Sequence, residues 1–404
     1  MLPIIRTVSP LLTSTVFLLM GVGLLHSLVA VHGRSIGYSV AMIGVLTSAY
    51  YAGFLAGTYV VPRLTHRIGH IRSFAFCVVV VTLSVLVQAV TSSYAWWLAM
   101  RILQGLLLVG VYAIIESWLN ASADRLRRSS IFAVYMMLNL GAGAVAQQFL
   151  RLPEEAFVLF CVVAMLFSAA ALPVIATSQP EPTMGAVPKV QIRRLFRLAP
   201  TALVSSLISG LVLGALWGLL PVYAQASGFD MTRIGTYMSA AILGGVVMQW
   251  PLGRFSDRID RRLALALISA CAALVALANL WLPSGRYELA LAAVFAFGGM
   301  VFALYPIAVA HLVDYVDHAE LLSASSTVLL VNGIGSAVGP LVAGALMSRW
   351  QPALLFAWFA TLNGLFAVYA LHRFVRRKRE VTAHDSFAPL VQTAVDALRK
   401  NTPG

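Results

Sequence analysis

Long apolar stretches, separated by short polar connectors, run along nearly the whole chain. A helix needs about 20 apolar residues to cross roughly 30 Å of hydrocarbon, and each stretch is long enough to do so. Few polar positions interrupt these stretches, so most side chains are expected to contact lipid or other apolar helices. The pattern predicts twelve membrane-spanning helices, near residues 10–32, 38–61, 73–92, 95–119, 130–150, 156–177, 200–224, 231–251, 263–283, 287–310, 322–347 and 352–372.

One connector is longer and more polar than the others, and it divides the chain almost equally. It contains three prolines together with Lys189, Arg193, Arg194 and Arg197. The domain organisation that follows is a six-helix N-terminal half at 1–177, a cytoplasmic linker at 178–199, a six-helix C-terminal half at 200–372 and a basic cytoplasmic tail at 373–404.

An internal repeat supports this division. A shift of 191 residues without gaps superposes the first two predicted helices on the seventh and eighth, and matches several glycines and one arginine. Repeated halves are typical of transporters whose binding site lies between the halves near the middle of the membrane. The matched pairs include Gly23 and Gly214, Gly37 and Gly228, Gly53 and Gly244, and Arg67 and Arg258. We therefore predict an all-α membrane protein with two pseudo-symmetric six-helix halves.

The composition excludes a soluble domain. Hydrophobic residues make up 60% of the chain and charged residues only 11%, whereas a soluble domain carries roughly 25% charged residues. Cys77, Cys161 and Cys271 lie far apart in separate apolar stretches, so we expect neither a disulfide framework nor a metal site. No nucleotide-binding glycine loop is present, so we expect no cofactor and no direct use of ATP.

The positive charge follows membrane topology. The net charge is +13, but its residues are dispersed among the connectors, which argues against a nucleic-acid partner. Lys and Arg are retained on the cytoplasmic side during insertion. Only five of the 28 Lys and Arg residues fall in connectors of the opposite side, and one, Arg101, falls within a predicted helix. This predicts a multi-pass membrane protein with both termini in the cytoplasm.

A charged motif follows the eighth predicted helix. It reads Gly253-Arg-Phe-Ser-Asp257-Arg258-Ile-Asp260-Arg261-Arg262, and it resembles the loop signature of the major facilitator superfamily, with Asp260 in place of the second glycine. In the first half, Pro62, His66, Arg67, Gly69 and Arg72 keep the spacing of this signature, with proline and histidine at two of its positions.

Other motifs extend the resemblance from the first helix to the last. Arg101-Ile-Leu-Gln104-Gly105 is similar to a second signature of the superfamily. The segments 116–120, 249–262 and 305–311 look like the YcaD-like branch of the superfamily. The resemblance implies the twelve-helix fold of this family and a bacterial inner-membrane facilitator.

Charged residues near the cytoplasmic helix ends are candidates for a gate. Carboxylates can accept hydrogen bonds from free amides at a helix start, and arginines can pair with acids across the two halves. The resemblance implies that Asp257 caps the start of the fifth helix, at Ser129 and Ser130, in the outward-facing state. From the neighbouring basic loops we expect Glu116 to lie near Arg63 and Arg67, and Asp314 to lie near Arg258. The candidate gate residues are Arg67, Glu116, Gly253, Asp257, Arg258, Arg262 and Asp314. A basic loop that only sets topology is the alternative, and Glu116 is also a candidate proton carrier.

Polar and aromatic residues at mid-depth are candidates for a substrate cavity. A cation within hydrocarbon costs roughly 3 kcal/mol or more, so Arg101 is expected to face a partner or a wet cavity, unless it reaches the outer headgroups. The other candidates could equally be hydrogen-bonded packing residues. The set is His26, Tyr51, Arg101, Gln104, Asn139, Gln147, Trp217, Tyr237, Tyr305 and Asn332.

The pattern favours a monomeric secondary transporter that moves a small organic solute by alternating access, driven by a proton gradient. Efflux of an amphipathic compound is slightly favoured, and import of a small metabolite is an alternative. Antiporters of the superfamily usually carry a Gly-Pro element in helix five, and its absence between Asn139 and Gly143 weighs against an antiporter. An enzyme is not expected, because His26, Glu116 and His311 fall at different depths. A non-transporting sensor with the same fold is a second alternative.

Overall fold

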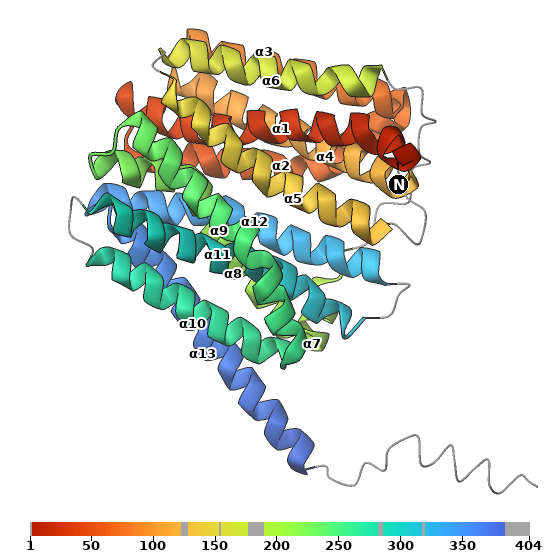
Figure 1. Ribbon diagram of the computed structural model, residues 1–404, viewed down its shortest axis with the longest axis vertical. Coiled ribbons are helices and arrows are strands. Elements are labelled where there is room, and N and C mark those ends of the chain that lie inside the picture. Colours follow the sequence, from red (N-terminus) through yellow and green to blue (C-terminus); the bar gives the residue numbers. More distant parts are fainter. Residues whose placement is uncertain are drawn as a thin grey trace, which may run out of the picture.

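The computed structural model describes residues 2–122, 128–152, 155–176, 190–281, 286–316 and 320–383, which form helices and no strand. Figure 1 shows their arrangement. The helices are α1 (Leu2–Ser35), α2 (Val40–Ile68), α3 (His70–Val90), α4 (Tyr94–Ser122), α5 (Arg128–Ala146), the 3-10 helix η1 (Gln147–Arg151), α6 (Ala156–Ile175), α7 (Ile192–Leu198), α8 (Pro200–Ala226), α9 (Met231–Arg258), α10 (Arg261–Leu280), α11 (Tyr287–Val313), α12 (Leu321–Arg349) and α13 (Leu354–Ala383).

The helices confirm the predicted all-α membrane fold. Within the described residues, ten helices are long and apolar enough to cross a membrane. The two long helices outside this set are α5 and α9. In α9 the last turns carry Arg254, Asp257 and Arg258, which lowers the hydropathy of the helix. For these two helices the predicted crossing stays a prediction.

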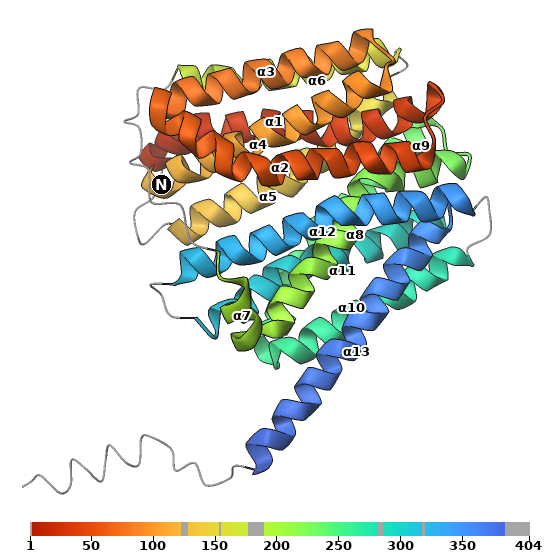
Figure 2. The same cartoon turned by 180° about the vertical axis from the view of Figure 1, so that it is seen from behind.

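Two groups of helices lie side by side. Figures 1 and 2 show α1–α6 on one side of the molecule and α8–α13 on the other, with α3 and α6 at one edge and α10 and α13 at the opposite edge. We call α1–α6 the first group and α8–α13 the second group. The α1–α2 end of the molecule carries the turn between α1 and α2, and the α2–α3 end is the opposite one, where α1 begins and α13 ends.

The edge helices expose apolar side chains. Large hydrophobic residues that would be costly in water are exposed on each of them. Hydrocarbon is a suitable environment for such a surface, because lipid tails are as apolar as leucine. Examples are Phe76 and Leu83 on α3, Met165 and Leu172 on α6, Leu274 on α10, and Leu365 and Val368 on α13.

The turns at the α1–α2 end are built alike in the two groups. Gly37 and Gly228, which the repeat matches, both have positive φ, at 96° and 82°. Two residues later, Ser39 and Asp230 cap the next helix, because their side chains accept hydrogen bonds from the backbone N–H groups of Met42 and Arg233. Only glycine adopts this backbone region without strain, so the matched glycines have a physical reason to recur.

Glycines also bring helices into close contact at equivalent places. A Cβ on Gly53 of α2 would overlap the carbonyl of Ile102 on α4, and a Cβ on Gly244 of α9 would overlap the carbonyl of Phe295 on α11. The α2–α4 contact is also closed from the other side, because a Cβ on Gly105 would overlap the carbonyl of Tyr50. This close approach is how helices gain packing energy in lipid, where no hydrophobic effect drives them together.

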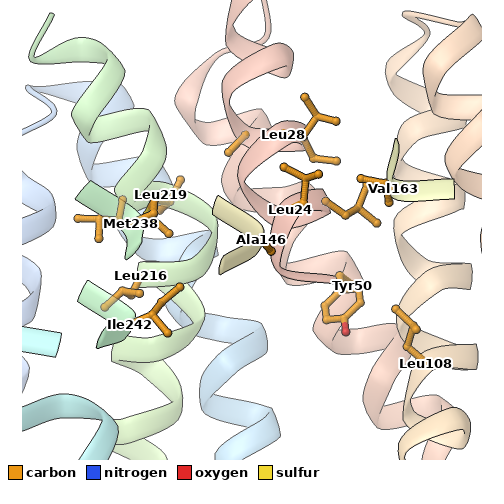
Figure 3. Close-up of a cluster of buried hydrophobic side chains, with 14 of the residues drawn as sticks. Leu24, Leu28, Tyr50, Leu108, Ala146, Val163, Leu216, Leu219, Met238 and Ile242 are labelled. Atoms are coloured by element: carbon orange, nitrogen blue, oxygen red, sulfur yellow. The ribbon is translucent and has the colours of Figure 1, made fainter. Parts of the chain in front are cut away.

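One hydrophobic core continues from the first group into the second. Leu24 and Leu28 of α1 belong to the same buried cluster as Leu216 of α8 and Met238 of α9. In Figure 3, Ala146 at the end of α5 lies between the α1 side chains and those of α8 and α9. Apolar packing therefore holds the two groups together at this depth.

The α2–α4 contact gives a stability prediction. Gly105→Ala is expected to lower the free energy of unfolding by about 1–3 kcal/mol, because the added methyl group has to push the backbone of α2 away. Thermal unfolding in detergent measures the effect. The control is Gly141→Ala on α5, where a Cβ would meet nothing within 4 Å. Equal midpoints for the two variants would contradict the interpretation of the glycine contact.

Candidate functional site

A cluster of polar side chains is buried inside the first group. Arg101 of α4, with only 1% of its surface exposed, lies at its centre. The side chains come from four different helices. We call the set the Arg101 cluster: His26 of α1, Tyr50 of α2, Ser84 and Gln88 of α3, and Arg101 and Gln104 of α4.

Hydrogen bonds connect the cluster into one chain. Arg101 Nη2 lies 2.9 Å from His26 Nδ1, and Arg101 Nη1 donates to Gln104 Oε1 at 3.2 Å. Gln104 Nε2 donates to Ser84 Oγ at 3.1 Å and to Gln88 Oε1 at 2.8 Å. Because arginine nitrogens only donate, His26 Nδ1 is the acceptor, and its imidazole is neutral with the proton on Nε2.

The charge of Arg101 has no carboxylate partner among the described residues. Its guanidinium carbon lies 4.6 Å from the centre of the Tyr50 ring, a distance at which the cation is attracted to the ring face. Arg101 Nε has no hydrogen-bond partner within the described part of the chain. The alternative that Arg101 reaches the headgroups is therefore wrong in this structure, because its guanidinium group turns inward to His26.

His26 lies where the first group meets the second. Its ring packs edge-on against Tyr50, with centroids 4.7 Å apart, and stacks on Tyr51 at 6.3 Å. From the second group, the Trp217 ring of α8 lies 6.1 Å away, and Trp217 in turn packs against Phe302 of α11. The predicted cavity residues His26, Tyr51 and Trp217 are thus brought together beside the Arg101 cluster.

Polar contacts join the two groups at the α1–α2 end. Gln148 Nε2 of η1 donates to Ser239 Oγ of α9, whose hydroxyl donates to Ala144 O of α5 at 2.8 Å, and Arg151 Nη2 donates to Thr236 Oγ1 at 3.4 Å. On the other side, Gly44 of α2 and Gly344 of α12 face each other in direct backbone contact. We call these contacts the seam: α5 and η1 contact α9, and α2 contacts α12.

Three of the predicted cavity residues contact neighbouring helices. Gln147 holds η1 to α1, because its Nε2 donates to Gly23 O at 2.9 Å and its Oε1 accepts from Ser27 Oγ at 2.6 Å. Asn332 holds α12 to α8 by donating to Ser206 O at 3.0 Å. Tyr237 is fully buried and packs against Phe229 within the second group. These three were predicted to line a cavity, and their contacts are those of packing residues.

Asn139, Tyr305 and Glu116 lie further toward the α2–α3 end. Asn139 of α5 and Tyr305 of α11 are half-buried. Glu116 of α4 retains an exposed surface and accepts a hydrogen bond from Tyr135 Oη at 3.1 Å. Arg63, predicted to lie near Glu116, donates to Tyr59 O of its own helix at 3.1 Å.

Two predicted gate residues of the second half, Asp257 and Asp314, belong to a charged network at the α2–α3 end. Arg261 Nε lies 2.8 Å from Asp314 Oδ2, and Arg261 Nη2 lies 3.0 Å from Asp257 Oδ1. Arg262 pairs with Asp260 at 2.8 Å. With His311, residues of this network line a cavity of about 340 Å³ between α9, α10 and α11.

One contact of the predicted gate needs correction. Arg261, and not Arg258, is the ion-pair partner of Asp314, because Arg258 ends α9 while Arg261 begins α10 beside the end of α11. A Cβ on Gly253 would meet nothing within 4 Å, so close contact does not explain this glycine.

Two predicted gate contacts remain untested. The side chains of Ser129 and Ser130, the predicted partners of Asp257, lie outside those that the structure describes. Arg67 is exposed at the end of α2.

Sequence reasoning missed Tyr50, Ser84 and Gln88 of the cluster. A signal for two of them exists, because Ser84 and Gln88 are four residues apart on an otherwise apolar stretch and so share one helix face. Tyr50 has no such signal, since its neighbour Tyr51 has the same chemistry and only the packing of α2 on α4 decides which ring meets Arg101.

Comparison with known proteins identifies relatives along most of the chain. A model of the Major Facilitator Superfamily matches residues 11–304. An uncharacterized MFS-type transporter of Yersinia enterocolitica is 30% identical over 333 residues, which cover 81% of this chain and 85% of that protein. The uncharacterized MFS-type transporter YcaD of Escherichia fergusonii is 28% identical over 383 residues, which cover 94% of this chain and 98% of that protein.

Solved structures share the fold. A mutant of the nucleoside transporter NupG has a TM-score of 0.73 at 15% identity, covering 90% of this chain and 98% of that one. A D-xylose–proton symporter has a TM-score of 0.71 at 11% identity, covering 90% and 97%. A bacterial homolog of the lysosomal transporter Spinster, inward-facing and occupied, has a TM-score of 0.69 at 16% identity, covering 93% and 97%.

Asp260 gives a prediction of pH-dependent stability. Its carboxylate caps α10 by accepting a hydrogen bond from the Arg262 backbone N–H at 2.9 Å. It also accepts hydrogen bonds from the Arg262 side chain. Burial alone would raise the pKa of Asp260, but these bonds from Arg262 hold it below its usual value. Asp260→Ala is expected to cost about 1 kcal/mol at pH 7.

The sign of the pH effect follows from the lowered pKa. Stabilisation by the charged carboxylate is present above its ordinary pKa of about 3.9 and is lost as the pH falls through the lower folded-state value. The difference in unfolding midpoint between the natural protein and Asp260→Ala should therefore shrink below about pH 4. Asp257→Ala, at an exposed side chain, is the control. A difference that stays constant down to pH 3 would contradict the role of the charge.

Proposed function

Because the chain belongs to the Major Facilitator Superfamily, a family of membrane transporters rather than of enzymes, we propose that this secondary transporter moves a small organic solute by alternating access. The two helix groups are the parts that rock against each other, and the Arg101 cluster with Tyr51 and Trp217 lies where they meet. The chain is a multi-pass protein of the bacterial inner membrane. We assign its α2–α3 end to the cytoplasm, because most Lys and Arg residues of the connectors lie there.

The observation that carries this proposal is the seam. Alternating access requires contacts between the groups at one end that can break while the groups stay joined elsewhere. The seam consists of a few hydrogen bonds and close glycine contacts at the α1–α2 end, between helices of different groups. Besides the Gly44–Gly344 contact, Gly235 of α9 lies close to Gln147 O of η1. Such contacts are weak enough to exchange, since each hydrogen bond contributes only about 1 kcal/mol. With the α2–α3 end in the cytoplasm, the described state is closed toward the outside.

Glu116 is the proposed site of proton coupling. Among the described residues of the ten apolar spans, the only carboxylates are Glu116 and Glu288, and Glu288 is the second residue of α11. Glu116 lies about 9 Å from the end of α4 at Ser122. A carboxylate at such depth is costly when charged, so it is a natural place for a proton to bind and leave during a transport cycle. The rings beside His26 support an amphipathic solute, and efflux is the direction to test first.

The test of this function is transport by the purified protein in liposomes. A thermal-shift screen at two pH values first identifies a solute that stabilises the folded protein. The natural protein should then move that solute against its gradient when a pH gradient is imposed. A stabilising solute that never crosses the membrane, with or without a pH gradient, would overturn the proposed function.

Glu116→Gln tests the coupling. The variant is expected to lose pH-driven accumulation completely while it retains exchange of labelled for unlabelled solute, because the amide cannot carry a proton but leaves α4 in place. Accumulation and exchange are measured in the same liposomes. Glu288→Gln, in the first turn of α11, should behave like the natural protein. If Glu116→Gln still accumulates solute in response to the pH gradient, Glu116 is not the coupling residue.

A further inference from the structure

Arg101 carries a buried positive charge that only neutral groups surround. Its hydrogen-bond partners are the imidazole of His26 and the amide of Gln104, and the Tyr50 ring covers its face. Within the described part of the chain, no ion pair involves Arg101. Neutral dipoles offset part of the cost of burying a guanidinium group but leave its charge uncompensated.

Three nitrogens of the cluster remain unpaired, and all three are donors. Arg101 Nε and Gln88 Nε2 are buried without a hydrogen-bond partner. His26 uses Nδ1 as an acceptor, so its Nε2 carries a proton, and this donor has no partner in the described structure either. A site with one uncompensated cation and surplus donors matches a ligand group that is negatively charged and rich in acceptors.

The surroundings of His26 restrict the rest of such a ligand. The rings of Tyr51 and Trp217 lie within 6.3 Å of the imidazole centre, and Phe302 packs behind Trp217. Aromatic faces at a boundary between two helix groups suit an apolar or aromatic body. One arginine balances one negative charge, which favours a carboxylate over a doubly charged phosphate.

We propose that Arg101 and His26 bind the carboxylate of an amphipathic monocarboxylate, whose apolar body packs against Tyr51 and Trp217. This inference rests on the proposed transport function, and it names the substrate class. In the described state Arg101 is almost fully buried and His26 Nδ1 holds the acceptor position beside it. When the seam opens, a carboxylate takes that position and accepts two parallel hydrogen bonds from the guanidinium group.

Matched pairs of acids and amides test the charge requirement. The probes are phenylacetate with phenylacetamide, and indole-3-acetate with its amide, titrated into the full-length protein in lipid nanodiscs. Each acid is expected to bind at least about tenfold more tightly than its amide, since a hydrogen-bonded charge pair contributes more than a neutral hydrogen bond. If no acid binds, or if acid and amide bind equally, the proposal is overturned.

Variants at Arg101 locate the effect. Arg101→Gln should bind acid and amide about equally, while Arg101→Lys should keep a reduced preference for the acid, because lysine retains the charge without the forked geometry. Arg349→Gln, an exposed arginine at the end of α12, is the matched control and should leave the preference unchanged. Elution as a single species shows that each variant is folded. An Arg101→Gln variant that is folded and still prefers the acid tenfold would overturn the proposal.

Liposome transport separates this inference from the proposed function. If the protein transports a cation or an uncharged solute and Arg101→Gln transports it equally well, the monocarboxylate inference fails while the transporter stands. If monocarboxylates bind with the expected dependence on Arg101 but no solute crosses the membrane, the binding site stands and the transport function fails.

Discussion

An unpaired polar group is costly in hydrocarbon, and most of this structure follows from that constraint. The described backbone is helical because a helix satisfies its own N–H and C=O groups. The constraint acts on side chains in the same way. Arg101 cannot remain alone in the first group, so α1 supplies His26, α2 supplies Tyr50, and Gln104 passes the hydrogen bonds on to Ser84 and Gln88 of α3.

The same constraint links the site to the seam. The Arg101 cluster lies about 10 Å along α4 from its first residue, Tyr94, so it is near the α1–α2 end that the seam closes. His26 and Trp217 extend the cluster to the boundary between the groups. Opening the seam therefore changes the surroundings of Arg101. A ligand that pairs with Arg101 then shifts the balance between the state with the seam open and the state with the seam closed.

The sequence predicted the helices well because their signal is strong and local. Apolar length located the ten spans, and the recurrence of Gly37 and Gly228 predicted turns that the structure builds with the same positive φ and a cap two residues later. The cost of an intramembrane charge predicted that Arg101 faces a partner, and in the structure it contacts His26 and Gln104.

Choices between neighbouring residues were beyond sequence reasoning. Whether Arg258 or Arg261 meets Asp314 depends on how the chain turns between α9 and α10, and nothing in the composition of the loop decides it. Gln147 has the polarity expected of a cavity residue, but its Nε2 and Oε1 each make a hydrogen bond that joins η1 to α1. Hydrogen-bond partners depend on helix rotation, which the apolar pattern of a membrane helix determines only loosely because its faces are alike.

The most direct test of alternating access is the distance across the seam. Spin labels at Leu152→Cys and Arg233→Cys, in a background without Cys77, Cys161 and Cys271, report that distance by pulsed electron paramagnetic resonance in lipid nanodiscs. We predict a major short distance and a minor longer one that grows in Gly44→Ala, where the added methyl group would clash with Pro340 of α12, and not in Gly364→Ala, where a Cβ has room. A single distance, identical in both variants, would contradict the account.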